Sequence, residues 1–119
     1  MKIFLLAINL FVLSVAAIAQ QKQTGNEPDK NKKILIVEAA CGQCKLGLKG
    51  GDCDLAIRID GQAYYVDGTK IDDHGDAHAK DGFCNAIRKA KVQGEIIDNR
   101  FKATYFQIIP ATPTQKKDQ

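Results

Sequence analysis

Four cysteines and two histidines are the side chains of this 119-residue chain best suited to metal binding or covalent chemistry. Thiolates and imidazoles are common zinc ligands, and two residues between two cysteines allow both to reach one ion from a single turn. An even number of cysteines in a small domain is equally typical of disulfides. The candidate residues are Cys41, Cys44, Cys53, His74, His78 and Cys84.

The motif Cys41-Gly42-Gln43-Cys44 follows an apolar run, as the C-x-x-C motif of thiol–disulfide oxidoreductases does. In those enzymes a helix N-terminus stabilises the reactive thiolate. Here residues 45–51 contain three glycines and predict a poor helix, and no proline follows at the place of the usual cis-proline partner. Thiol–disulfide exchange is therefore the least favoured interpretation, and we expect no enzyme activity.

The segment His74-Gly75-Asp76-Ala77-His78 places two imidazoles four residues apart. This spacing would bring both rings to one side of a helix, where they could join a metal site. Asp76 would then orient an imidazole instead of binding the ion. The alternative is that both histidines are exposed loop residues.

Residues 1–19 have the features of a secretory signal peptide. Lys2 precedes an apolar run, which is shorter than the roughly 20 residues of a membrane span, and Ala17-Ile18-Ala19 is a small-x-small cleavage signal. We expect cleavage after Ala19, no membrane span in the mature protein, and a periplasmic or secreted location in a bacterial envelope.

The rest of the chain predicts one small domain. Polar residues at 20–32 and 111–119 predict a disordered lead-in and a disordered tail, which leave a single domain over 33–110. A core of that size contributes only a few kcal/mol, so a metal or disulfides should support it. The net charge of +3 is too small to favour binding to nucleic acid.

Apolar alternation and turn residues predict the order strand, strand, strand, helix, strand, strand. The Asp60-Gly61 pair is a strong hairpin signal between the second and third strands. This is the element order of an OB-fold, a five-stranded Greek-key barrel with a helix after its third strand. The expected segments are strands over 34–40, 55–59, 62–66, 92–97 and 101–109 and a helix over 81–90.

In such a meander, the end of the first strand, the start of the second and the end of the third share one edge. Cys41 and Cys44 follow the first strand, Cys53 precedes the second, and the histidine loop follows the third. Cys84, in the first turn of the expected helix, can join them. The topology thus predicts that the candidate ligands gather at one edge.

Several short motifs occur together along the domain: Cys41-Gly42-Gln43-Cys44, Gly51-x-Cys53-x-Leu55-Ala56, Asp60-Gly61 with Tyr64 or Tyr65 and Val66, His74-Gly75-Asp76-Ala77-His78, Gly82-Phe83-Cys84 and Ala90-x-Val92-x-Gly94-Glu95. In this combination they resemble a family of small, exported, functionally uncharacterised bacterial proteins of the Bacteroidetes type. The resemblance extends from Cys41 to about Ile108. It implies an envelope protein without an established activity, with another envelope protein as the kind of partner to expect.

The sequence therefore predicts an exported, non-catalytic binding module with a Cys/His-rich site. Ligand softness favours Zn²⁺ or Cu⁺ as the bound ion. The alternative is a domain stapled by two disulfides without a metal, in which each bridge would contribute about 2–4 kcal/mol.

Overall fold

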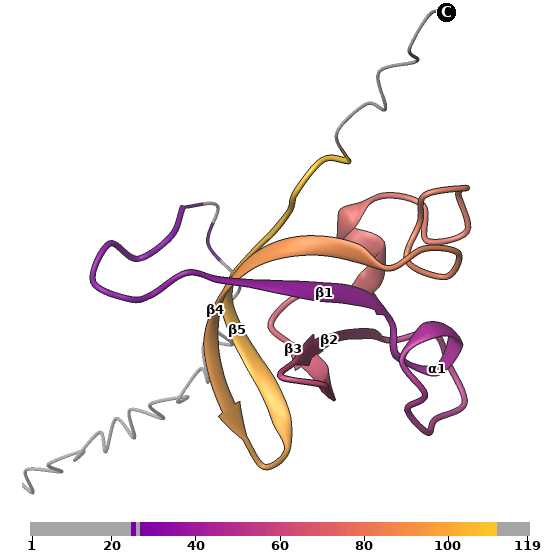
Figure 1. Cartoon of the computed structure of the whole chain (residues 1–119), viewed down its shortest axis with the longest axis horizontal. Helices are drawn as coiled ribbons and strands as arrows, with labels where there is room; N and C mark the ends of the chain where they lie inside the picture. Colours follow the sequence, from indigo (N-terminus) through magenta and orange to yellow (C-terminus); the bar gives the residue numbers. More distant parts are fainter. Residues whose placement is uncertain (1–24, 26, 112–119) are drawn as a thin grey trace, which may run out of the picture.

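The structure is a computed structural model that describes Gly25 and residues 27–111. Five strands form a closed barrel in the order β1-β2-β3-β5-β4, and β4 pairs with β1 to close it (Figure 1). The predicted fold class, a small five-stranded β-barrel, is confirmed. The strands are β1 (Leu35–Cys41), β2 (Leu55–Ile59), β3 (Gln62–Asp67), β4 (Arg88–Ile97) and β5 (Arg100–Ile108).

Neighbouring strands of the barrel are antiparallel, with one exception. β3 and β5 run parallel and are paired only at Val66–Phe101 and Asp67–Lys102. The two hairpins turn at Asp60-Gly61 and Asp98-Asn99, where all four residues have positive φ. Turns of that conformation match the twist of the flanking strands, so the predicted Asp60-Gly61 hairpin is confirmed.

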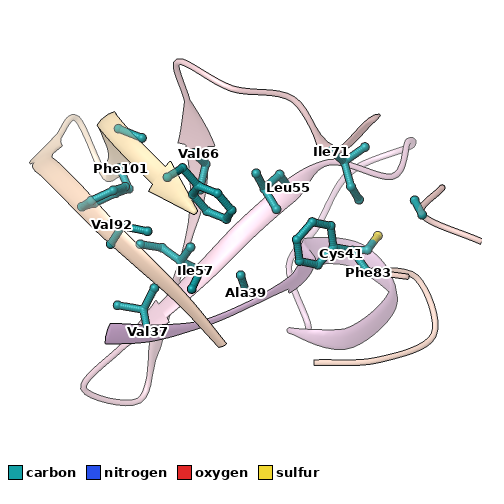
Figure 2. Close-up of a cluster of buried hydrophobic side chains, with 14 residues drawn as sticks. Val37, Ala39, Cys41, Leu55, Ile57, Val66, Ile71, Phe83, Val92 and Phe101 are labelled. Carbon is teal, nitrogen blue, oxygen red and sulfur yellow. The ribbon is translucent and has the colours of Figure 1, made fainter. Parts of the chain in front are cut away.

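The barrel interior is filled by aliphatic and aromatic side chains from all five strands and from the loop before β4 (Figure 2). Phe101, Ile57 and Val92 are almost completely buried at its centre. Cys41 also belongs to this core, so the first predicted ligand lies where the barrel interior meets its edge. The core comprises Val37, Ala39, Cys41, Leu55, Ile57, Val66, Ile71, Ala77, Phe83, Ala90, Val92, Phe101, Ala103 and Phe106.

A β-bulge lies between Gln93 and Gly94 in the β4–β5 hairpin. It accounts for the imperfect alternation of β5, where the adjacent residues Tyr105 and Phe106 are both buried. Phe106 packs in the barrel core. Tyr105 instead forms a bridge with Gly25 of the segment before β1.

The predicted helix over 81–90 is wrong. β4 already begins at Arg88, and the described residues have their α-helix elsewhere, in the single turn α1 (Gly42–Lys45) between β1 and β2. Residues 81–85 form turns and a bend instead, and the side chain of Asn85 donates hydrogen bonds to the carbonyl oxygens of His78 and Ala79. Such bonds to the backbone compete with a helix. The apparent helical periodicity combined buried residues from a loop and from a strand.

A 3₁₀ turn, η1 (Ile71–His74), occupies the part of the chain just after β3. Ile71 is buried in the core, which ties this turn to the barrel. His74 at its end therefore has a fixed position relative to β5. The orientation of this turn decides where the predicted histidine ligands lie.

Part of the predicted lead-in is attached to the barrel through Gln93, whose side chain is only 1% exposed. Its Nε2 donates to the carbonyl oxygens of Asp29 and Lys32, and its Oε1 accepts from the Asp29 amide. The predicted signal peptide and residues 112–119 of the predicted tail lie outside the described residues. Within the described part, no helix has the length and apolarity needed to cross a membrane.

Candidate metal centre

Cys41 precedes a single helical turn, and Cys44 lies within that turn. β1 ends at Cys41, and α1 follows immediately. The Cys41 Sγ caps this turn by accepting a hydrogen bond from the Cys44 amide over 3.3 Å. A backbone N–H directed at sulfur favours the thiolate form that binds a metal.

Cys53 and Cys84 come from two other segments. Cys53 lies in the loop before β2, and Cys84 lies in the turns that replace the expected helix. The Cys84 amide donates to the carbonyl oxygen of Ala77 over 2.9 Å. Phe83, beside Cys84, is only 2% exposed and anchors this segment in the core.

Backbone hydrogen bonds join the three cysteine segments next to the sulfur-bearing residues. The Cys41 amide donates to the carbonyl oxygen of Phe83, and the Gly42 amide donates to that of Asp54. Phe83 precedes Cys84 and Asp54 follows Cys53 in the sequence, so the two bonds connect the Cys41 turn to the segments of both other cysteines. The positions of the sulfur atoms therefore follow from the barrel and its main-chain contacts.

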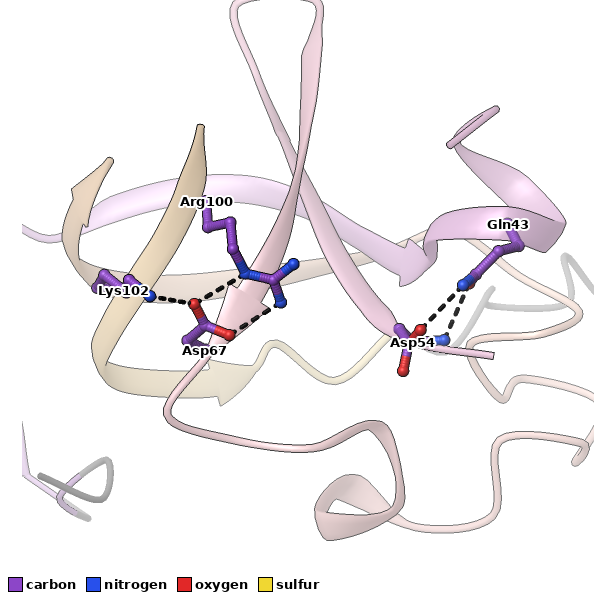
Figure 3. A network of polar contacts seen from close by, with 5 residues as sticks. All are labelled: Gln43, Asp54, Asp67, Arg100 and Lys102. Carbon is purple, nitrogen blue, oxygen red and sulfur yellow. Dashed lines mark hydrogen bonds and ion pairs between the residues drawn. The ribbon is translucent and has the colours of Figure 1, made fainter. Parts of the chain in front are cut away.

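Gln43 strengthens the link between α1 and the Cys53 segment (Figure 3). Its Nε2 donates to the Asp54 carboxylate and its Oε1 accepts from the Asp54 amide, both over 2.9 Å. Sequence reasoning missed this pair, because Gln43 was only one of two spacer residues. An amide side chain within a C-x-x-C turn was the available signal.

The four Sγ atoms all lie within 4.8 Å of one another. Sulfur atoms bound to a tetrahedral Zn²⁺ at about 2.3 Å are about 3.8 Å apart. Four thiols in this arrangement can surround one ion with small adjustments. They are graded in exposure, from buried Cys41 through half-buried Cys53 and Cys84 to exposed Cys44.

The cysteines are free in this structure. The closest contact is between the Sγ atoms of Cys53 and Cys84, at 2.6 Å, which is longer than the about 2.05 Å of a disulfide bond. Among the described residues no pair of cysteines lies at the length of a disulfide bond, so the alternative with two disulfides has no support from this geometry.

The surroundings of Cys41 and Cys53 shift the pKa values of these two thiols in opposite directions. Burial opposes ionisation of Cys41, but hydrogen bonds from the Cys53 and Cys44 thiols and from the Cys44 and Gln43 amides outweigh it and lower the pKa of the Cys41 thiol. Burial, followed by hydrogen bonds with Cys41 and Cys84, raises the pKa of the Cys53 thiol. Binding of a metal ion would release the thiol protons, since metal ligation requires thiolates.

The two predicted histidine ligands lie outside this cysteine cluster. The His74 ring is 4.6 Å from the Phe106 ring centre to centre, and its Nε2 lies 2.9 Å from the Thr69 hydroxyl. Burial lowers the pKa of His74. His78 is on the surface with 81% of its side chain exposed. This geometry therefore gives no support to histidine ligands.

A cavity of about 880 Å³ lies beside the end of β3 and the β4–β5 hairpin, and the cysteines do not line it. Its wall includes Asp67, whose carboxylate accepts hydrogen bonds from Arg100 and Lys102 (Figure 3). These bonds outweigh burial and lower the pKa of Asp67 to about 2. This ion-pair network joins β3 to β5 where the two strands have few backbone contacts.

Comparison with known proteins identifies the family of this chain. No curated protein and no solved structure matches the chain at a significant level. A family model matches residues 35–109, from the start of β1 to just beyond β5, and therefore includes all four cysteines. The chain belongs to DUF6370, a family of unknown function.

Proposed function

We propose that this protein is an exported, non-catalytic binding module whose four cysteines hold one transition-metal ion. The observation that carries this proposal is the convergence of four free Sγ atoms, from three chain segments, within 4.8 Å. Main-chain hydrogen bonds next to Cys41 and Gly42 prearrange those segments. Cys41, Cys44, Cys53 and Cys84 are the proposed ligands.

Zn²⁺ is the ion that best fits this ligand set. Four thiolates complete a tetrahedral shell, which is the usual coordination of structural zinc. Cu⁺ also prefers soft sulfur ligands and is the second candidate. The two ions can be separated by competition, because the same thiols would bind both.

A complete shell of four protein ligands supports a non-catalytic role. Zinc enzymes keep one coordination position open for water or substrate, whereas structural sites are closed. Bound metal would stabilise a small barrel by linking α1 to the loops that carry Cys53 and Cys84. In this proposal the ion holds together one end of the barrel.

The proposal includes export to a bacterial periplasm or secretion, which the pattern of residues 1–19 supports. We also propose that the barrel is an OB-like fold, which the strand order β1-β2-β3-β5-β4 supports. A Bacteroidetes-type origin and an envelope protein partner complete the proposal.

Titration of the reduced, metal-free protein with Co²⁺ and then Zn²⁺ tests the site. We expect the visible absorption of tetrahedral cobalt thiolate at one equivalent and its loss when Zn²⁺ displaces the cobalt. Cys44→Ser should weaken binding without removing a core side chain, because Cys44 is exposed. His78→Ala, which changes an exposed side chain outside the cluster, is the matched control and should leave the titration unchanged.

Two outcomes would contradict the proposal. One is the absence of a cobalt thiolate spectrum in a protein with four titratable thiols. The other is equal binding by wild type and Cys44→Ser together with weakened binding by His78→Ala, which would move the site to the histidine loop.

A further inference from the structure

Cys53 and Cys84 are arranged differently from the other pair of cysteines. Their Sγ atoms are 2.6 Å apart although 31 positions separate the residues in sequence. A decrease of about 0.5 Å would bring them to the length of a disulfide bond. Both side chains are half-buried, so a small oxidant can approach them from solvent.

We propose that Cys53 and Cys84 form a redox-sensitive pair that closes to a disulfide and releases the metal ion. The release step rests on the function proposed above, whereas the pairing of the two sulfurs does not. The site would hold metal when its four thiols are reduced. It would lose two of its four ligands when this pair is oxidised.

The oxidation balances with a peroxide as the oxidant. One thiolate of the pair attacks a peroxide oxygen, the O–O bond breaks, and a sulfenic acid forms. The second thiolate attacks that sulfur, the S–S bond forms, and hydroxide leaves. The two sulfurs together lose two electrons, and hydrogen peroxide with two protons becomes two molecules of water.

The Cys41–Cys44 pair is less suited to this reaction. Cys41 has no exposed surface, and its Sγ is held at the start of α1 by the Cys44 amide. Cys53 and Cys84, in contrast, lie in loops outside the strands and can approach each other with little change in the barrel. After their oxidation Cys41 and Cys44 would remain as two thiols, which bind an ion less tightly than four.

The chain offers a direct way to map the bond. Trypsin cleavage after lysine and arginine places Cys41 and Cys44 in peptide 34–45, Cys53 in peptide 50–58 and Cys84 in peptide 81–88. The Zn²⁺-loaded full chain is treated with increasing hydrogen peroxide. Free thiols are then alkylated, the protein is digested without reduction, and released Zn²⁺ is measured with a chromogenic chelator.

We expect peptides 50–58 and 81–88 to be joined, peptide 34–45 to carry two alkyl groups, and one Zn²⁺ to be released per link. Dithiothreitol should restore both the thiols and Zn²⁺ binding, which separates a disulfide from irreversible sulfinic or sulfonic acids. Cys84→Ser should not form the link, and circular dichroism checks that this variant folds.

An internal disulfide in peptide 34–45, or a link from that peptide to either of the others as the main product, would overturn the proposed pairing. Retention of Zn²⁺ after the 53–84 link has formed would overturn the release step. The same peptide mapping on reduced, metal-free protein tests the pairing independently of the metal. If the protein does not bind Zn²⁺, the proposed function is contradicted, but the pairing of Cys53 with Cys84 can still be measured.

Discussion

The backbone amide of Gly42 donates a 2.8 Å hydrogen bond to the carbonyl oxygen of Asp54. This bond joins the residue after Cys41 to the residue after Cys53, across the start of the barrel. Gly42 is buried, and a Cβ at this position would lie 2.7 Å from the Tyr65 ring. The close approach of α1 to β3 therefore requires a glycine here.

Gly42→Ala should destabilise the protein by about 1–3 kcal/mol, because the added methyl group overpacks the contact with Tyr65. It should also weaken metal binding, since displacement of α1 moves Cys41 and Cys44. Chemical denaturation and Zn²⁺ titration measure the two effects. Gly51→Ala is the control, because a Cβ at Gly51 meets nothing within 4 Å. Equal stability of the two variants would contradict this role of Gly42.

Gln43→Ala should weaken Zn²⁺ binding about 10- to 100-fold, as loss of groups that orient metal ligands does elsewhere. The substitution removes both hydrogen bonds to Asp54 and frees the Cys53 segment from α1. Competition with a chelator of known affinity measures the change. Gln62→Ala, on the exposed surface of β3, is the control. An unchanged affinity for Gln43→Ala would show that this link does not position the sulfurs.

Gln93→Ala should lower the free energy of unfolding by about 1–3 kcal/mol, because it removes three hydrogen bonds made by a buried side chain. It should also release the segment around Asp29 from β4. Limited trypsin digestion should then cleave after Lys30, Lys32 or Lys33 faster than in wild type. If cleavage is as slow as in the Gln62→Ala control, the Gln93 contacts do not hold this segment.

Asp67→Asn should remove a stabilising effect that depends on pH. The folded-state pKa of Asp67, about 2, is below its ordinary value of 3.8, so the carboxylate stabilises the fold above that ordinary value and loses this effect as pH falls toward 2. At neutral pH the substitution should lower the free energy of unfolding by about 1 kcal/mol. The effect is this small because solvent weakens the partly exposed ion pairs.

The measurement is the difference in unfolding free energy between Asp67→Asn and wild type, both metal-free, over a series of acidic pH values. The difference should shrink as the pH falls. Asp72→Asn changes an exposed carboxylate that forms no ion pair within the described part of the chain, and it serves as control. A difference that stays constant down to the pKa of Asp67 would contradict the role of this network.

The strands were predictable because their signals are local. Alternation at Leu55, Ile57 and Ile59 and the turn at Asp60-Gly61 define a hairpin without knowledge of its neighbours. The helix over 81–90 failed because the same local signal was ambiguous. Phe83 is buried from a loop and Ala90 from a strand, and single-sequence periodicity does not separate these cases.

The cysteine cluster was predictable in outline, since a meander brings the end of one strand close to the start of the next. The positions of the histidines were not. They depend on η1 and on the turns after it, where His74 packs against Phe106 and His78 faces solvent. Residue spacing alone does not specify the path of such a loop. The contacts between Gln43 and Asp54 are also tertiary, and the amide side chain in the C-x-x-C turn does not by itself identify its partner.

The most direct test of the proposed metal centre is the metal content and thiol state of untagged protein purified from its native compartment without chelators. Elemental analysis and intact mass under native and denaturing conditions should give one Zn²⁺ or Cu⁺ per chain and four reduced cysteines after the ion is removed. Less than about a tenth of an equivalent of metal, with the protein four hydrogens lighter than its reduced form, would instead show two disulfides and contradict the proposed metal site.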